Sequence, residues 1–221
     1  HVETNVSMIA LIRWTDYNDA SPEVCTALSS IPFPRYIDIQ GTGTNQVMLT
    51  AGSAEGSPMS FLTTADGAFF APAFTVGNLA ADPVERGGQR GCAMYVGAGT
   101  PQQPQYLIGC DNHTGGQQNG IHVYRHDGVG YVYQGEMNPT SPESSNGIQS
   151  IAVDLGFPPT ESVDGQDPVL IAVGYHTNAT HKSAFYMFNL RTLEEVAVLP
   201  FTPASGPMQL YGAIDLDTEN N

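Results

Sequence analysis

The sequence predicts an all-β fold, a β-propeller or partial propeller of four-stranded blades that forms one domain over residues 1–221. The composition is the first observation: with 24 Gly, 16 Pro and 13% charged residues, the chain favours strands and turns over helices. Short apolar segments also alternate with Gly-rich and Asp-Gly turns along most of the chain. From residue 35 these segments recur at a period of roughly 55–60 residues, with four strands in each unit. Because one such unit cannot bury both of its faces, we expect the units to stack around an axis.

The N-terminal region is predicted to contribute one strand, over residues 6–14. Its sequence, VSMIALIRW, is apolar, and periodicity alone does not distinguish a strand from a helix there. We expect a strand because the run is short. Trp14, the only tryptophan, ends this run and is expected to pack in the core or between blades.

The first unit covers residues 35–80. A strand, RYIDIQ, leads into a loop of Gly, Thr and Asn, and the strand QVMLT follows. The hairpin SFLTTADGAFF, with an Asp-Gly turn, supplies the third strand and begins the fourth. From Asp38 to Gly43, oxygen-bearing side chains occupy alternate positions and two glycines are interleaved, which lets a loop fold its acceptors around a hard cation. The alternative is an ordinary polar hairpin turn, because Gly and Asp dominate turns.

The second unit covers residues 90–137, with the segments GCAMYVGAG, QYLIGC and IHVYRHDGVGYVYQGEM. Cys92 and Cys110 lie at the two ends of its first hairpin, so we expect a cross-strand disulfide in an oxidising compartment. Cys25 is then left over, which indicates either a partner outside this sequence or a buried thiol. No cysteine pair has the close spacing of a structural zinc site.

The third unit covers residues 147–201 and contains an acidic insertion, FPPTESVDGQDP, between its first two strands. A partial unit, MQLYGAIDLDTENN, occupies residues 208–221. A closed propeller usually has four to eight blades. We therefore expect that the chain belongs to a longer protein, or that self-assembly or another chain completes the propeller, because an open sheet edge would otherwise be exposed.

The charge of the chain limits its partners. A formal charge of −15, from 22 acidic residues against seven lysines plus arginines, opposes binding to nucleic acid or anionic lipid. No stretch reaches the roughly 20 apolar residues of a membrane helix, and no signal peptide is visible. The acidity is compatible with cation binding and a salty extracellular setting, and solubility alone is the simpler alternative.

Motifs for catalysis are missing from the sequence, whereas motifs for glycosylation are present. No Gly-x-Ser-x-Gly elbow, phosphate loop or activated cysteine is recognisable. Asn-X-Ser/Thr triplets begin at Asn5, Asn112 and Asn178, which predicts N-glycosylation if the source is eukaryotic. Alternating aromatic residues such as Tyr131 and Tyr133 are expected to pack between blades, with sugar stacking as the alternative.

Residues 38–49, DIQGTGTNQVML, resemble the Asp-rich repeat of the FG-GAP/VCBS family, the repeats of integrin-α-like propellers. In that family the loop between the first two strands typically reads Asp-x-Asp-Gly-Asp-Gly. The resemblance extends from about residue 35 to the end of the chain, and it implies calcium-binding loops. The ligands that it implies are Asp38, Asp154, Asp164, Asp167, Asp215, Asp217 and Glu219. The third and fourth units match best, because Gln40 and Thr42 replace acids in the first loop and the second unit has no acidic loop.

Family resemblance and the missing catalytic groups together predict an extracellular or cell-surface module that binds, adheres or assembles without catalysis. Calcium is its expected cofactor, and a protein or a glycan is its expected ligand. Two alternatives remain, a carbohydrate-binding lectin and an enzyme such as a propeller-type polysaccharide lyase or a phytase-like phosphatase.

Overall fold

The chain folds as β-structure throughout the part that the computed structural model describes. The described residues are 9–13, 23–28, 34–52, 58–77, 91–110, 120–139, 148–154, 169–174 and 184–200. They form three four-stranded antiparallel sheets, one two-stranded sheet and a single short 3-10 turn, Gly43–Asn45. The predicted all-β class and the four-stranded antiparallel sheets are therefore confirmed.

Each four-stranded sheet is a meander in which consecutive strands are hydrogen-bonded neighbours. Sheet I contains β3 (Pro34–Gln40), β4 (Val47–Gly52), β5 (Met59–Thr64) and β6 (Phe70–Val76). Sheet II contains β7 (Gly91–Tyr95), β8 (Tyr106–Cys110), β9 (Ile121–His126) and β10 (Tyr131–Met137). Sheet III contains β11 (Ile148–Asp154), β12 (Val169–Gly174), β13 (Ala184–Asn189) and β14 (Glu194–Pro200). The remaining pair is β1 (Ile9–Arg13) with β2 (Glu23–Leu28).

The three sheets also share a break in register between their third and fourth strands. The shift falls between Phe61 and Leu62 in sheet I, between Tyr133 and Gly135 in sheet II, and between Met187 and Phe188 in sheet III. Such a bulge increases the local twist and makes a fourth strand a poor template for further pairing. The same device at the same place indicates that the sheets are built on one plan.

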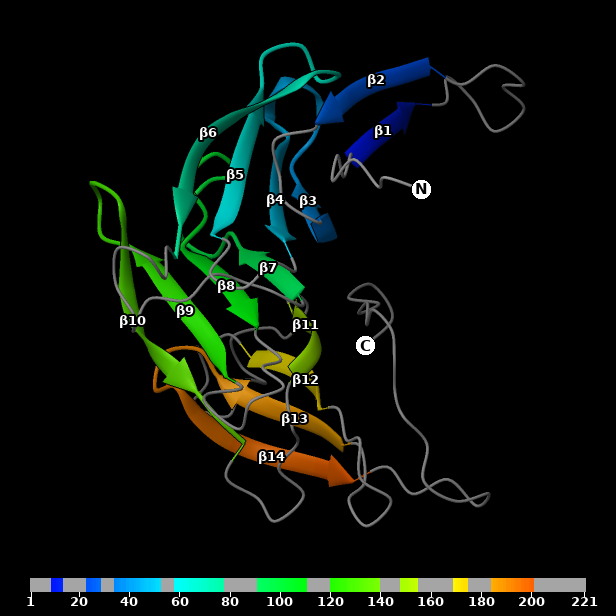
Figure 1. The fold of residues 1–221 in the computed structure, drawn as a ribbon. Helices are drawn as coiled ribbons and strands as arrows, with labels where there is room; N and C mark the ends of the chain where they lie inside the picture. Colours follow the sequence, from blue (N-terminus) through cyan, green and yellow to red (C-terminus); the bar gives the residue numbers. More distant parts are fainter. Residues whose placement is uncertain are drawn as a thin grey trace, which may run out of the picture.

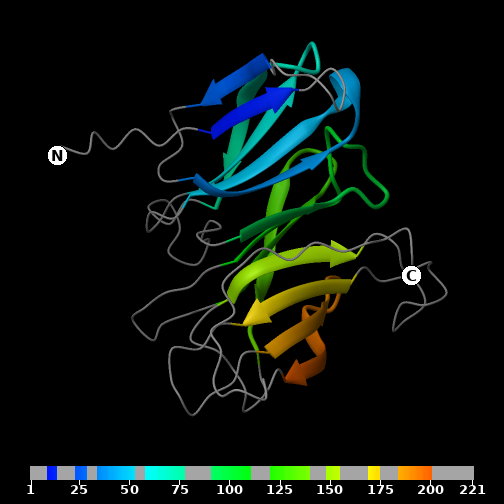
Figure 2. The same cartoon turned by 90° about the vertical axis from the view of Figure 1, so that its right-hand side faces the viewer.

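The sheets follow one another in chain order, each layered against the next (Figure 1). Their first strands are neighbours, because β7 contacts both β3 and β11, whereas the fourth strands β6, β10 and β14 lie on the outside. The view in Figure 2 shows the layers from the side, with the β1–β2 pair beside sheet I and sheet III at the other end. Sheet II is therefore enclosed between two other sheets.

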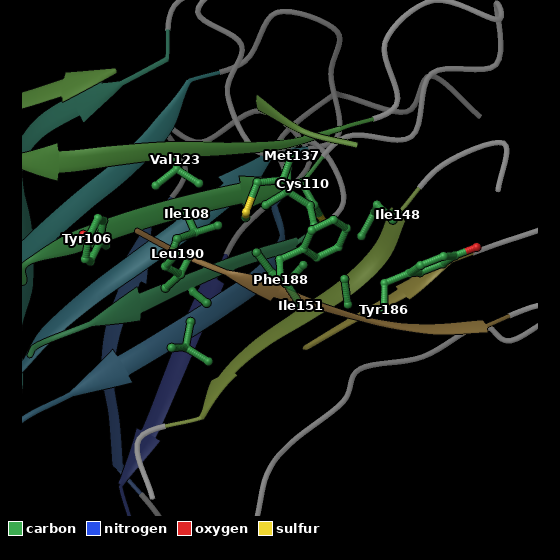
Figure 3. Packing of buried hydrophobic residues seen from close by; sticks show 14 of the residues in the cluster. Tyr106, Ile108, Cys110, Val123, Met137, Ile148, Ile151, Tyr186, Phe188 and Leu190 are labelled. Carbon is green, nitrogen blue, oxygen red and sulfur yellow. The ribbon is translucent and has the colours of Figure 1, made fainter. Parts of the chain in front are cut away.

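Two apolar clusters occupy the two faces of sheet II. One joins it to sheet I through residues such as Leu49, Phe61 and Tyr124. The other joins it to sheet III through residues such as Ile108, Tyr186 and Phe188, which interlock in Figure 3. A sheet covered on both faces needs apolar side chains at successive positions, and this explains the uninterrupted apolar sequences of β7 and β8.

The predicted disulfide between Cys92 and Cys110 is wrong. In the β7–β8 ladder, Cys92 is paired with Gly109, and Cys110 with Gly91. Neighbouring positions along a strand point to opposite faces, so the two sulfur atoms lie on different sides of sheet II. Cys92 belongs to the cluster shared with sheet I, and Cys110 to the cluster shared with sheet III. A shift of one residue in register thus separates side chains that the sequence places at matching ends of a hairpin.

Several predicted features lie outside the described residues. These are Trp14, the third-unit insertion at residues 157–168 and the partial unit at residues 208–221. Across the described ranges, no helix has both the length and the apolar character needed to cross a membrane.

Candidate functional site

The loops at one end of sheets I and II lie at the surface, and most of their residues are exposed or half-buried. They comprise residues 41–46 and 96–105, which join first to second strands, and residues 65–69 and 127–130, which join third to fourth strands. In a meander, these two kinds of connection lie at the same end of the sheet. We call these four segments the loop rim.

Loops from the two sheets contact each other directly in the loop rim. The Gln102 side chain donates from Nε2 to Asn45 Oδ1 at 3.0 Å, across 57 positions of sequence. Close packing also joins the segments, because a Cβ atom on Gly41 would lie 3.1 Å from Pro101 Cβ. A Cβ atom on Gly67 would lie 3.0 Å from the carbonyl carbon of Gly43. The absence of side chains at these glycines lets the loops meet.

The first loop is shaped by its glycines and by the 3-10 turn. Gly41 and Gly43 have φ angles of +84° and +56°, a region that side-chain-bearing residues rarely adopt. The Asn45 amide donates to Thr42 O at 3.0 Å, and the Gln46 amide donates to Gly43 O at 3.2 Å. These bonds turn the Thr42, Thr44 and Asn45 side chains outward, where all three are exposed.

The longer loop, residues 96–105, is held by the sheet beneath it. The Gly99 amide donates to Val96 O at 2.8 Å, and the Ala98 amide donates to Gln105 Oε1 at 3.2 Å. Tyr131 on β10 donates its hydroxyl proton to Pro104 O at 2.9 Å. Thr100 and Gln103 also exchange two backbone hydrogen bonds, at 3.1 and 2.9 Å, so the loop turns at Pro101 and Gln102 and leaves the Gln103 side chain exposed beside that turn.

An Asp or Asn side chain caps the turn between the third and fourth strands in each of the three four-stranded sheets. Asp66 Oδ1 accepts from the amides of Ala68 and Phe69 at 2.8 Å, and Asp127 Oδ1 accepts from Val129 and Gly130 at 2.8 and 2.9 Å. Asn189 Oδ1 does the same for Arg191 and Thr192 in sheet III, at 2.8 and 3.0 Å. Sequence analysis missed this repeat, although the dipeptides Asp66-Gly67 and Asp127-Gly128 were a usable signal.

The cap bonds lower the pKa values of the two aspartates. Amide donation from Phe69 and then Ala68 lowers the pKa of Asp66, and donation from Gly130 and then Val129 lowers the pKa of Asp127. Both carboxylates are therefore ionised at neutral pH, and their Oδ1 atoms face their own backbone. This arrangement stabilises the two hairpin turns.

The exposed chemistry of the loop rim combines neutral hydroxyls and amides with two ionised carboxylates, those of Asp66 and Asp127. Its side chains supply hydroxyls and amides, and neither lysine nor arginine occurs in the four segments. Two apolar side chains stand at the hairpin tips, Phe69 with 57% of its surface exposed and Val129 with 95%. Hydrogen-bonding groups beside exposed apolar groups are suited to a polyhydroxyl ligand or a protein surface.

Asp38, the first predicted calcium ligand, lies in strand β3 and faces sheet II. Its Oδ2 accepts the amide proton of Met94 on β7 at 2.6 Å, and its Oδ1 accepts from Gln40 Nε2 at 3.2 Å. The Cys92 thiol on β7 lies within hydrogen-bonding distance of Leu49 O, at 3.5 Å. Burial, with the nearby Asp38 charge as a second cause, raises the pKa of that thiol well above its ordinary value. In the described structure, Asp38 therefore joins sheet I to sheet II through a hydrogen bond.

The other predicted site residues are not brought together by the described structure. Asp154 ends β11, and its side chain is not described. Outside the described residues lie the predicted ligands Asp164, Asp167, Asp215, Asp217 and Glu219, and the sequon residues Asn5, Asn112 and Asn178. Within the described ranges, no three His, Cys, Asp or Glu side chains are grouped closely enough to hold a metal ion.

The alternating aromatic residues pack between sheets, as the sequence predicts. Tyr124, Tyr186 and Phe188 are buried. Tyr131 stacks on Phe74 of sheet I with ring centroids 5.5 Å apart, so its ring face is used within the molecule. Phe69, the single aromatic residue of the loop rim, is 57% exposed and available for stacking on a ligand.

Comparison of the chain with protein families, with curated proteins and with solved structures finds no match. Functional assignment therefore depends on the residues and contacts described above.

Proposed function

We propose that this chain is the propeller-forming part of an extracellular or cell-surface binding protein of the FG-GAP/VCBS type. Three layered meanders with neighbouring first strands support the propeller arrangement, since blades stack in this order around an axis. The repeated register break and turn cap support a common origin for the units. The sequence resemblance at residues 38–49 supports the choice of family.

The binding surface that we propose is the loop rim. The observation that carries this proposal is its construction: loops of two sheets are bonded to each other and to the strands, so their exposed side chains are held in place before any ligand arrives. Pre-organisation of this kind lowers the entropic cost of binding. Its ligand would be a glycan or a protein with a hydrogen-bonding surface.

Calcium is proposed for the acidic segments between Asp154 and Asp167 and between Asp215 and Glu219. The number of carboxylates in these segments supports this assignment, with four acidic residues from 154 to 167 and three from 215 to 219, because Ca²⁺ prefers six to eight oxygen ligands. Asp38 is not included, since both of its oxygens already accept protein hydrogen bonds.

A glycan array and a panel of extracellular-matrix proteins would test the binding role, with thermal unfolding measured with and without calcium. We expect the protein to bind one class of ligand, and we expect Phe69→Ala and Gln103→Ala to weaken that binding. The melting temperature should be higher with calcium than without it. Val132→Ala, in an exposed position on the outer strand β10, is the matched control and should leave binding unchanged. Turnover of a polysaccharide or a phosphate ester that EDTA stops would contradict the non-catalytic proposal.

A lectin is the more specific form of this proposal, and the rim's hydroxyls and amides together with the exposed Phe69 favour it. Sugar rings present apolar faces and outward hydroxyls, which match a surface that offers both an exposed aromatic ring and hydrogen-bonding groups. Glycan-array binding that Phe69→Ala removes would support the lectin, whereas binding to proteins alone would contradict it.

A further inference from the structure

His126, the last residue of β9, forms hydrogen bonds to both segments that sheet II contributes to the loop rim. Its backbone amide donates to Gln105 O at 3.0 Å, at the end of the 96–105 loop. Its ring nitrogen Nδ1 accepts the amide proton of Gly128 at 3.1 Å, within the 127–130 turn. That turn lies at the outer edge of the molecule, where β9 passes into β10 (Figure 1). One half-buried residue therefore bonds to the turn through its ring and to the loop through its backbone.

The His126 ring also packs against the residue that supports the longer loop. It meets the Tyr131 ring edge to face, with the ring centroids 5.0 Å apart and the planes inclined by 75°. The Tyr131 hydroxyl donates to Pro104 O at 2.9 Å, and the Tyr131 ring stacks on Phe74 of sheet I. A change in the position of the His126 ring would therefore reach the 96–105 loop through Tyr131 as well as through the backbone.

The hydrogen bond from Gly128 requires one protonation state of the imidazole. A ring nitrogen that accepts a hydrogen bond carries no proton, so the neutral His126 ring holds its proton on Nε2. A second proton, added to Nδ1, would face the Gly128 N–H group and remove the bond. Histidine is the side chain whose ordinary change of charge falls between about pH 5 and 8. Asp127 stays ionised through this range, because the amides of Gly130 and Val129 lower its pKa.

Two charged residues flank His126 in the sequence. Asp127 follows it, and the charge of His126 is a smaller cause of the low pKa of Asp127, after the amide bonds. Arg125 precedes it on the opposite face of the sheet, where the guanidinium carbon lies 6.0 Å from the centroid of the Tyr106 ring. Asp127 is therefore the group toward which a protonated His126 ring would be drawn.

The elements packed around His126 add no positive charge. Neither β6 nor the 96–105 loop contains an ionisable side chain. The ionisable side chains of β10 are Tyr131, Tyr133 and Glu136. Glu136 is paired with His122, toward the other end of β9. Protonation of His126 would therefore place a positive charge beside a rim whose own charged side chains are Asp66 and Asp127.

We propose that His126 makes the shape of the loop rim depend on pH. When the ring is neutral, Nδ1 holds the Gly128 amide, and the 127–130 turn and the 96–105 loop keep their mutual arrangement. When the ring is protonated, it releases Gly128 and moves toward the Asp127 carboxylate, so the turn opens and the support that Tyr131 gives to the loop is displaced. This inference goes beyond the proposed function, since it concerns the rim itself and holds whether the rim binds a glycan or a protein.

NMR spectra of the isotope-labelled full chain test this proposal without a ligand. As the pH falls from about 8 to about 5, the amide proton of Gly128 should move upfield, because it loses its acceptor. The amide signal of Gln105 should change over the same range. Both changes should share the midpoint of the carbon-bound protons of the His126 ring.

Two variants identify the group that titrates. His126→Gln has no titratable ring, so the pH-dependent changes at Gly128 and Gln105 should disappear. Asp127→Asn keeps both the histidine and an Oδ1 acceptor but removes the titration of the carboxylate, so the change at Gly128 should persist. A change at Gly128 that persists in His126→Gln, or is lost in Asp127→Asn, would overturn the proposal.

The unmodified chain keeps the proposal testable if a variant does not fold. Long-range proton–nitrogen spectra of the His126 ring should identify Nδ1 as the unprotonated nitrogen at about pH 8, and an unprotonated Nε2 would contradict the proposal. A Gln105 amide signal that stays fixed while the His126 ring titrates would also overturn it, because the loop would then not respond to the ring. These measurements use no ligand, so they succeed or fail independently of the proposed binding function.

Discussion

The hydrogen bond between the Asp38 carboxylate and the Met94 amide allows a quantitative test of how sheets I and II are held together. Asp38→Ala removes the carboxylate that accepts the Met94 amide proton at 2.6 Å, and Met94 is only 1% exposed. A buried amide left without an acceptor costs about 1–3 kcal/mol. Because Asp38 is only half-buried, we take about 2 kcal/mol as the expected loss of unfolding free energy. For a chain of this size, that loss corresponds to a fall of roughly 4–8 °C in melting temperature.

Urea and thermal unfolding, followed by circular dichroism, measure this loss. Gln40→Ala is the control, because it removes the longer 3.2 Å bond to the other carboxylate oxygen and should cost less than about 0.5 kcal/mol. Equal effects of the two variants would refute the assignment of Asp38 as a bond between sheets. A loss seen only with calcium, and absent in EDTA, would instead identify Asp38 as a metal ligand.

Three further predictions concern the thiols, a turn cap and the first loop. Cys92 and Cys110 should each take up a thiol label after unfolding without reductant, and a linked peptide in mass spectrometry would contradict this. Because its pKa is lowered in the fold, Asp127 should stabilise the protein above the unfolded pKa of about 3.8, and this contribution should disappear as pH falls through the folded value. Asp127→Asn keeps the Oδ1 acceptor but cannot ionise. Its free energy of unfolding, measured over the same acidic pH range, should therefore lack that part of the pH dependence. Gly43→Ala should cost about 1–2 kcal/mol for its backbone conformation alone. Gly41→Ala should cost at least about 1 kcal/mol more by urea unfolding, because its methyl group would also collide with Asn45 and Pro101.

Local chemistry made much of the fold predictable from the sequence. Asp-Gly at positions 66–67 and 127–128 marks two hairpin turns, and apolar segments of strand length flank them. The uninterrupted apolar run of β8 also indicates a strand covered on both faces. These signals depend on neighbouring residues, so they can be read without knowing the tertiary structure.

Register and long-range contact were not predictable in the same way. Cys92 and Cys110 appear matched in sequence, but a one-residue offset in the ladder sends them to opposite faces. Asp38 resembles the first ligand of an acidic loop. Its shorter hydrogen bond, however, is the one that it accepts from the Met94 amide, 56 positions away in the sequence. The loop rim likewise depends on a hydrogen bond between residues far apart in the sequence, Asn45 and Gln102. The local sequence of neither loop predicts this bond.

A crystal structure of the full chain would test the order of the layers most directly. We expect β7 to lie between β3 and β11 near a common axis, with β6, β10 and β14 facing outward. Sheets I and III packed face to face as a sandwich, or fourth strands placed innermost, would contradict the propeller arrangement.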